Sequence, residues 1–245
     1  AVPAVKVADC KFNAQQTEKQ IVIADGKGIQ IIVFPELNLT GYSCGDLFAQ
    51  SLLLEQAELA LMQIVNNTRQ LDIISIVGMP VVVNSTLMNC AVVFQKGKIL
   101  GIVPKTYLPN YKEFYEKRWF TSAVAHPDSM NVRLCGQVVP MGTNLLFDTP
   151  DVCFGIELCE GACTSQLCTG PERCGDYLQP VCRYRKYQQA SVPPFVVGTA
   201  VSSLSGWICI FILRFRGIYY RCGFCRKRID LREWKPACRF RPFLI

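Results

Sequence analysis

Three residues with reactive side chains each stand at the end of a stretch whose composition predicts a β-strand. They are Glu36 after residues 29–34, Lys105 after residues 99–103, and Cys159 after residues 151–158. A carboxylate at the end of an apolar strand is partly desolvated, so its pKa can rise toward neutrality and it can act as a base. Taken singly, the three would be an exposed turn acid, a solvated lysine and a buried structural thiol. Their shared position at strand ends instead predicts a common site.

The single histidine narrows the chemistry that such a site can perform. His126 lies in the polar stretch 125–129, which is typical of a surface turn. A Ser-His-Asp or Cys-His device, or a metal site built from several histidines, would have to be assembled from this one residue. A nucleophile in this chain therefore needs a different base, and no metal site is expected.

The elements that must position these residues alternate between strand and helix. The β-branched run Ile29–Phe34 predicts a buried strand, and residues 46–67 predict a long amphipathic helix with Asp46 as its N-cap. The apolar run 73–83 is also strand-prone but is interrupted at Gly78 and Pro80. Residues 88–94 and 99–103 predict two strands joined by a hairpin turn at 95–98, and residues 151–158 predict another strand. The pattern predicts an α/β or mixed α+β class with a layered sheet.

Composition divides the 245 residues into two parts near residue 160. Residues 1–160 hold 12 Lys and Arg against 15 Asp and Glu, whereas residues 161–245 hold 14 against 4, so the net charge of +7 comes from the second part. Six of the 14 cysteines lie in the first part and eight in the second. Residues 1–13 have neither the basic nor the apolar region of a signal peptide, so the first part is expected to be cytoplasmic with reduced thiols.

The second part carries signals that contradict one another. Residues 192–213 hold no charge over about the length that a bilayer requires, and Arg214 follows them. Cys222 and Cys225 form a CxxC motif beside a basic run, which could be half of a zinc knuckle on a nucleic-acid-binding patch. A membrane-anchored protein and a zinc- or nucleic-acid-binding protein are therefore alternatives of another class. The preferred interpretation has neither a membrane nor a nucleic acid as partner.

Several motifs of the first part resemble a known family. The segments FPELNLTGY, VPKTYLPNY and FGIELCE hold Glu36, Lys105 and Cys159 in the order of the Glu-Lys-Cys triad of the nitrilase or carbon–nitrogen hydrolase superfamily. The stretches GDLFAQSLLLEQAELAL, PNYKEFYEKRWF and VPMGTNLLFDT are similar to the glutaminase domain of bacterial glutamine-dependent NAD⁺ synthetases rather than to a stand-alone amidase, which is the alternative within the superfamily. The resemblance covers about residues 3–160. It implies a nitrilase-like four-layer αββα sandwich, here incomplete.

The resemblance implies a role for each residue of the triad. Cys159 would attack the side-chain amide of L-glutamine, and Glu36 would accept the thiol proton. Lys105, together with the backbone N–H of Glu160, would stabilise the oxyanion. Water activated by Glu36 would then hydrolyse the thioester to glutamate after ammonia has left.

Two further residues and the reaction partners follow from the same resemblance. Glu113 would orient the lysine, and Tyr111 would contact the substrate glutamine. The glutaminase reaction would need no cofactor, because ATP and Mg²⁺ belong to the synthetase domain, which is expected to be absent from this chain. That domain would be the ammonia acceptor, and the intact family implies a homo-oligomer.

Residues 161–245 do not resemble the family. Back-translation from Gly161 onward, read one base later, permits further family-like stretches. We therefore interpret residues 1–160 as a partial glutaminase domain and residues 161–245 as an out-of-frame basic tail created by a short deletion after the codon for Glu160. Loss of the remaining family strands predicts a weak or inactive enzyme that exposes apolar sheet surface and aggregates.

Overall fold

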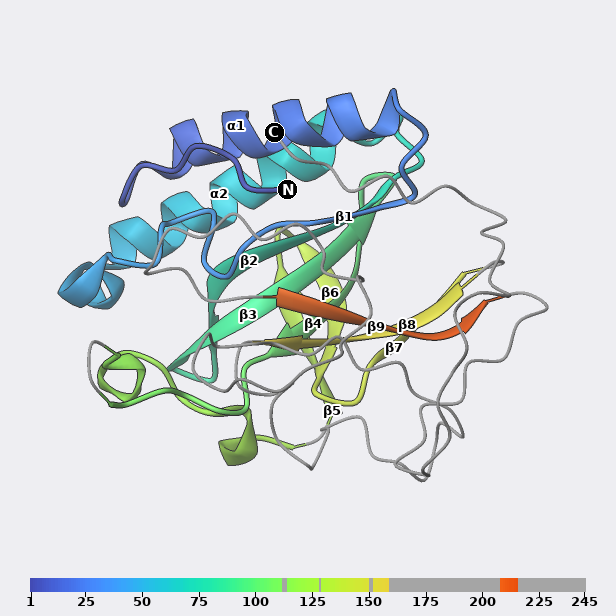
Figure 1. Cartoon of the computed structure of the whole chain (residues 1–245). Coiled ribbons are helices and arrows are strands. Elements are labelled where there is room, and N and C mark those ends of the chain that lie inside the picture. Colours follow the sequence, from blue (N-terminus) through green and yellow to red (C-terminus); the bar gives the residue numbers. More distant parts are fainter. Residues whose placement is uncertain (112–113, 128, 150–151, 159–207, 216–245) are drawn as a thin grey trace, which may run out of the picture.

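The computed structural model describes residues 1–111, 114–127, 129–149, 152–158 and 208–215 (Figure 1). Two helices lie side by side over one face of a large sheet, α1 (Cys10–Asp25) and α2 (Ser51–Asn67). Short 3₁₀ helices cover Gly45–Ala49 (η1), Glu116–Arg118 (η2) and Ala123–Ala125 (η3). The mixed α/β class expected from the sequence is confirmed.

The large sheet has six strands in the order β1-β2-β3-β4-β6-β5. Their bounds are β1 Ile31–Val33, β2 Ile74–Val83, β3 Thr86–Gln95, β4 Lys98–Pro104, β5 Ser129–Leu134 and β6 Gln137–Gly142. The β1–β2 and β4–β6 pairs are parallel and the others antiparallel. A second, antiparallel sheet holds β7 (Leu146–Asp148), β8 (Val152–Leu158) and β9 (Ile208–Phe215).

The two faces of the large sheet bury different partners. One face packs on the helices, in a core that includes Phe34, Leu61 and Val77. The other face packs on β8, where Ile76 and Val93 belong to the same buried cluster as Phe154 and Ile156. Within the described residues the layers are therefore helix, sheet and sheet, which are three of the four layers of the expected sandwich.

Helix α1 was not anticipated from the sequence, although its start follows ordinary capping. The Asp9 side chain accepts a hydrogen bond from the backbone N–H of Phe12 at 3.0 Å, as an N-cap should. Ala14, Ile21 and Ala24 are buried against the core, whereas Val22 and Ile23 are exposed. Because apolar residues occupy both faces of α1, the sequence has no clear amphipathic pattern that would predict this helix.

The prediction of a helix over residues 46–67 with Asp46 as its N-cap is wrong about where the helix starts. Residues 45–49 form η1, and α2 begins at Ser51 with Gln50 at its N-cap and no side-chain capping bond. Asp46 instead accepts hydrogen bonds from Arg118 and Trp119. Donors from a distant loop thus engage the carboxylate that would otherwise cap the helix.

Strand β2 is continuous through Gly78 and Pro80, where the sequence suggested interruptions. Pro80 pairs with Asn89 of β3, whose carbonyl oxygen accepts from the backbone N–H of Lys105 at 2.8 Å. Since the backbone oxygen of Asn89 faces β4, the missing N–H of Pro80 removes no ladder bond from this pair. The proline is therefore tolerated inside the sheet.

The predicted hairpin at residues 95–98 is confirmed. It joins β3 to β4, and its central residues Lys96 and Gly97 have φ values of 50° and 76°. Positive φ at both central residues is the signature of the tight turns that match the twist of paired strands. The predicted strands at 29–34 and 151–158 also correspond to β1 and β8.

Much of the basic tail lies outside the described residues, including Cys222, Cys225 and most of the uncharged stretch 192–213. In the part of the chain that the structure covers, none of the helices has the length and apolar character needed to cross a membrane.

Candidate active site

Glu36 is held by a turn that crosses β2 where β1 has ended. The Phe34 backbone N–H still donates to the Ile76 carbonyl oxygen at 2.9 Å, and then the chain leaves the ladder. Leu37 adopts a φ of 53°, which is uncommon for a residue with a side chain. The turn lies so close to Gly78 that a Cβ there would be 2.6 Å from the Pro35 carbonyl oxygen. Close backbone packing therefore fixes where the Glu36 side chain starts.

Asn38 continues the edge of the sheet with its side chain. Its Oδ1 accepts from the backbone N–H of Gly78 at 2.9 Å, and its Nδ2 donates to Thr17 Oγ1 on α1 at 2.9 Å. Both side chains are buried. The turn that carries Glu36 is thereby bonded to β2 on one side and to α1 on the other.

Lys105 follows the last residue of β4 and is only 1% exposed. Its Nζ lies 2.5 Å from Glu36 Oε1 and 2.7 Å from Glu116 Oε1. A charged lysine is almost never buried without partners. Two carboxylates within direct ion-pair distance therefore explain how this ammonium group remains in the core.

Glu116 and Glu36 each receive one further donor. The Tyr42 hydroxyl donates to Glu116 Oε1, and Asn89 Nδ2 donates to Glu36 Oε1. The second oxygen of each carboxylate is buried without a hydrogen-bond partner among the described residues. Both carboxylates thus use one oxygen to hold Lys105, and no described residue engages the other oxygen.

Burial dominates the electrostatics of this cluster. Burial, with a smaller contribution from the nearby Glu116, raises the pKa of Glu36 from 4.5 to about 7 against the opposing effect of the Lys105 ammonium. A carboxyl that titrates near neutral pH can exchange a proton with a thiol, whose ordinary pKa is about 8.5. The arrangement is therefore suited to a Glu base beside a fixed positive charge.

A second cluster holds the loop that carries Glu116. Asp46 on η1 accepts from Arg118 Nε at 2.8 Å and from Trp119 Nε1 at 3.0 Å. The Phe48 ring packs on the rings of Trp119 and Phe120, with centroids 6.0 and 4.9 Å apart. These contacts fasten residues 116–120 to the segment before α2 and so help to place Glu116 beside Lys105.

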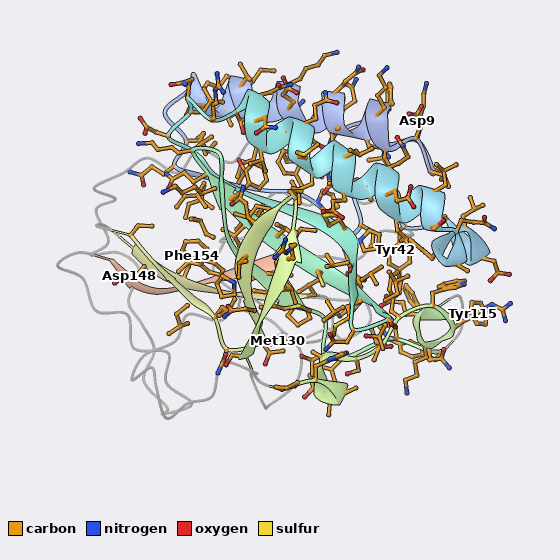
Figure 2. The ribbon with its side chains drawn as sticks, turned by 180° about the vertical axis from the view of Figure 1, so that it is seen from behind. Asp9, Tyr42, Tyr115, Met130, Asp148 and Phe154 are labelled. Carbon is orange, nitrogen blue, oxygen red and sulfur yellow. The ribbon has the colours of Figure 1, made fainter. Side chains whose placement is uncertain are left out.

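A series of aromatic ring contacts runs from Tyr42, beside Glu116, to Tyr111 at the surface. Tyr42 contacts Phe114 edge to face at 6.4 Å, and Phe114 contacts Tyr111 at 5.8 Å. Tyr111 is 48% exposed. Figure 2 shows Tyr42 and Tyr115 toward one side of the molecule, with Phe154 and Asp148 toward the other.

The structure brings together part of the site that the sequence predicts. Glu36 and Lys105 are in direct contact. Cys159, Glu160 and Glu113 lie outside the described residues; β8 ends at Leu158, immediately before the cysteine, and Leu158 is buried between the sheets. Their roles stay predictions.

Three residues of the cluster were not singled out from the sequence. Glu116 makes a contact with Lys105 of the kind expected of Glu113, whose role stays a prediction, and Asn89 and Tyr42 donate to the two carboxylates. Glu113 and Glu116 flank the aromatic pair Phe114 and Tyr115 in the segment after Lys105. A spacing argument alone cannot choose between them, because it does not give the path of the loop.

Two other features of the described residues carry no such chemistry. His126 lies in a loop, where its Nε2 is 3.0 Å from Thr86 Oγ1. No group of three His, Cys, Asp or Glu within the ranges that the structure covers could hold a metal ion.

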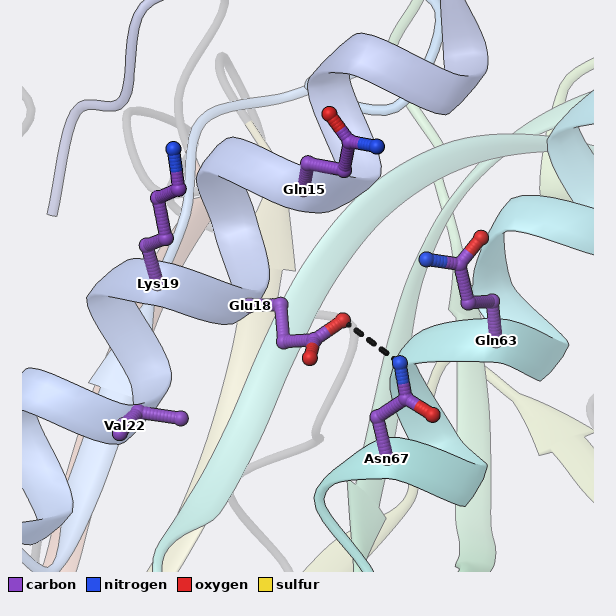
Figure 3. Close-up of a pocket in the computed structure, with 6 residues that line it drawn as sticks. All are labelled: Gln15, Glu18, Lys19, Val22, Gln63 and Asn67. Atoms are coloured by element: carbon purple, nitrogen blue, oxygen red, sulfur yellow. Dashed lines mark hydrogen bonds between the residues drawn. The ribbon is translucent and has the colours of Figure 1, made fainter.

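A surface hollow of about 340 Å³ lies between α1 and α2 (Figure 3). It is lined by Gln15, Glu18, Lys19, Val22, Gln63 and Asn67. The Asn67 Nδ2 donates to Glu18 Oε2 at 2.9 Å across it. No residue of the Glu36 cluster lines this hollow, so it is separate from the candidate active site.

Two layered sheets, with a buried Glu-Lys pair that follows strands β1 and β4 of the larger one, define the chain as a mixed α/β protein of nitrilase-like fold. The fold is similar to that of a solved glutamine-dependent NAD⁺ synthetase from Cytophaga hutchinsonii, with a TM-score of 0.56 and 26% identity over 62% of this chain and 26% of that one.

Sequence comparison gives the family directly. The carbon–nitrogen hydrolase family matches residues 3–169, so the chain belongs to the carbon–nitrogen hydrolases. It is 40% identical over 157 residues to the glutamine-dependent NAD⁺ synthetase of Mycobacterium tuberculosis, and 36% identical over 160 residues to that of Homo sapiens. These alignments cover 63% and 62% of this chain but only 23% and 22% of the relatives.

Proposed function

We propose that this chain carries the glutaminase site of a glutamine-dependent NAD⁺ synthetase. The observation that supports the proposal most directly is the buried cluster in which Lys105 bridges Glu36 and Glu116. The similarity to NAD⁺ synthetases favours glutamine as the amide over the substrate of a stand-alone amidase. The ammonia would pass to a synthetase domain, which the relatives' additional length could contain.

The reaction begins with transfer of the Cys159 thiol proton to Glu36. The thiolate then forms a C–S bond to the side-chain carbonyl carbon of glutamine, and the negative charge on the carbonyl oxygen is stabilised by Lys105 and the Glu160 N–H. Collapse of this intermediate breaks the C–N bond, and ammonia leaves with the proton that Glu36 returns. Tyr111 would contact the bound glutamine.

The second half of the reaction uses the same base. Glu36 takes a proton from water as the water attacks the thioester carbon, the C–S bond breaks, and Glu36 returns the proton to the Cys159 sulfur. Glu113 or Glu116 would keep Lys105 in place through both halves. Every proton taken is given back, so the cycle needs no metal or redox cofactor.

Residues 161–245 lead us to infer that turnover is weaker than in intact relatives, because the family-like stretches are missing from this frame. The test is glutamate release by the full chain from L-glutamine, compared with release of acid from a small aliphatic amide such as propionamide. Glutamine hydrolysis that disappears in Cys159→Ala is expected. Hydrolysis of the aliphatic amide in preference to glutamine would assign the chain to the stand-alone amidases instead.

A further inference from the structure

Asn89 links two of the three titratable residues of the cluster, Glu36 and Lys105. It lies on β3, fully buried, opposite Pro80 of β2 and next to the strand that leads to Lys105. Its backbone carbonyl oxygen accepts from the Lys105 N–H at 2.8 Å, while its Nδ2 donates to Glu36 Oε1. One residue of a central strand therefore holds the main chain of the lysine and the carboxylate of the glutamate.

The side-chain amide also determines which oxygen of Glu36 is engaged. Lys105 Nζ and Asn89 Nδ2 both donate to Oε1, and Oε2 has no partner among the described residues. A carboxylate held through one oxygen cannot rotate without breaking both bonds at once. Its other oxygen is consequently kept in one place, with an acceptor capacity that no described residue uses.

The amide itself is only half satisfied. Asn89 Oδ1 is buried and has no hydrogen-bond partner within the described residues. A buried polar atom without a partner costs free energy, and such atoms need an explanation. An apolar side chain at this position would avoid the cost, so the contact between Nδ2 and Glu36 is the feature that accounts for an asparagine here.

We propose that Asn89 is a positioning residue, which fixes the Glu36 carboxylate with Oε1 bound to Lys105 and leaves Oε2 to accept the proton of the nucleophile. The proposal rests on the proposed use of Glu36 as the base. A donor to the charged form of a carboxylate also favours that form. Removing the donor should therefore keep Glu36 protonated to higher pH.

The test measures the ionisation of Glu36 in the full chain, independently of turnover. Glutamate side-chain carboxyls labelled with ¹³C are followed by NMR as a function of pH, and Glu36→Gln identifies the Glu36 signal. Asn89→Leu keeps a branched side chain but removes the donor. The matched control is Ser75→Ala, since Ser75 is equally buried in the neighbouring strand and its hydroxyl has no partner in the described part of the chain.

In Asn89→Leu the Glu36 midpoint should rise by about one pH unit, which is a tenfold change in proton affinity. Ser75→Ala should leave it unchanged. A folded Asn89→Leu protein whose Glu36 midpoint equals that of the wild type overturns the proposal.

A second measurement on the wild type decides the matter if Asn89→Leu does not fold. The NMR resonances of the Asn89 side-chain NH₂ group should shift with pH at the Glu36 midpoint, because this group donates to the carboxylate that titrates. Resonances that stay constant through this midpoint overturn the proposal. The role of Glu36 as base is tested separately by the pH dependence of Cys159 alkylation. If the alkylation rate lacks an acid limb at the Glu36 midpoint, the proposed function fails, while the NMR result still decides the role of Asn89.

Discussion

Replacing Gly78 with alanine should displace the turn that carries Glu36. The added Cβ would lie 2.6 Å from the Pro35 carbonyl oxygen and 2.8 Å from Glu36 Cα. Both are backbone atoms, so no side-chain rotation can relieve the contact. Either β2 or the turn 35–37 has to move by roughly 1 Å to restore ordinary van der Waals separation.

The magnitude follows from the kind of strain. Inserting one carbon into a closely packed site costs about 1–3 kcal/mol of unfolding free energy. At a slope of about 2 kcal/mol per molar, a loss of 2 kcal/mol lowers the urea midpoint by about 1 M. If the turn moves, a misplacement of about 1 Å at Glu36 can reduce the rate of the catalysed step about 100-fold.

The assay is urea unfolding followed by far-ultraviolet circular dichroism, with Gly26→Ala as the matched control. A Cβ on Gly26 would be no closer than 3.4 Å to any neighbour, and the residue has an ordinary helical φ of −61°. Gly26→Ala should therefore unfold at the wild-type midpoint or slightly above it. A Gly78→Ala protein that unfolds at the same urea concentration as Gly26→Ala would refute the reasoning.

Two further outcomes follow from the structure and a third from the sequence. Burial raises the pKa of Glu36 from 4.5 to about 7, so the stability contributed by this group is present below pH 4.5 and lost as pH rises through about 7. In urea titrations, the unfolding free energy of Glu36→Gln should therefore rise relative to that of the wild type by on the order of 1–3 kcal/mol across that pH window. A difference that does not change with pH would contradict the burial argument. The Arg118 guanidinium lowers the pKa of Asp46 from 3.8 to about 2. In thermal unfolding, the loss of stability in Asp46→Ala should therefore be visible above pH 3.8 and fade as pH falls through about 2. A loss of stability that is equally large at low pH would count against the Asp46–Arg118 bond. Resequencing the coding DNA across Cys159 to Gly161 should show that restoring a few bases opens a family-like frame, and a confirmed frame in an expressed, maintained tail would instead reopen the membrane and metal alternatives.

Local signals account for the parts of the fold that the sequence predicts well. The turn at Lys96 and Gly97 follows from a short polar segment with a glycine between two apolar runs, and β1 follows from a β-branched run bounded by Gly28 and Pro35. The sequence predicts that Glu36 and Lys105 share a site because each follows a predicted strand and because both lie in motifs that resemble those of one family. These inferences depend on neighbours in the sequence or on a shared motif.

Tertiary contacts decide the parts that the sequence does not reveal. Asp46 has the position of an N-cap, yet its donors are Arg118 and Trp119, more than 70 residues away. Glu116 contacts Lys105 because its loop is turned by bonds such as that from its own N–H to the Pro109 carbonyl oxygen at 3.2 Å. The amide of Asn89 appears in the sequence as one polar residue in an apolar strand, and only the packed sheet brings it to Glu36.

The central claim is that Glu36, Lys105 and Cys159 form one glutamine-reactive site, and covalent labelling tests it most directly. The full chain is incubated near neutral pH with an electrophilic analogue of L-glutamine, and the modified cysteine is located by peptide mass spectrometry, with L-glutamine as competitor and Glu36→Gln as the base-deficient control. The account predicts one label, on Cys159, that is suppressed by L-glutamine and forms at least tenfold more slowly in Glu36→Gln. Label spread over several of the 14 cysteines, or a Cys159 label indifferent to both L-glutamine and Glu36, would contradict it.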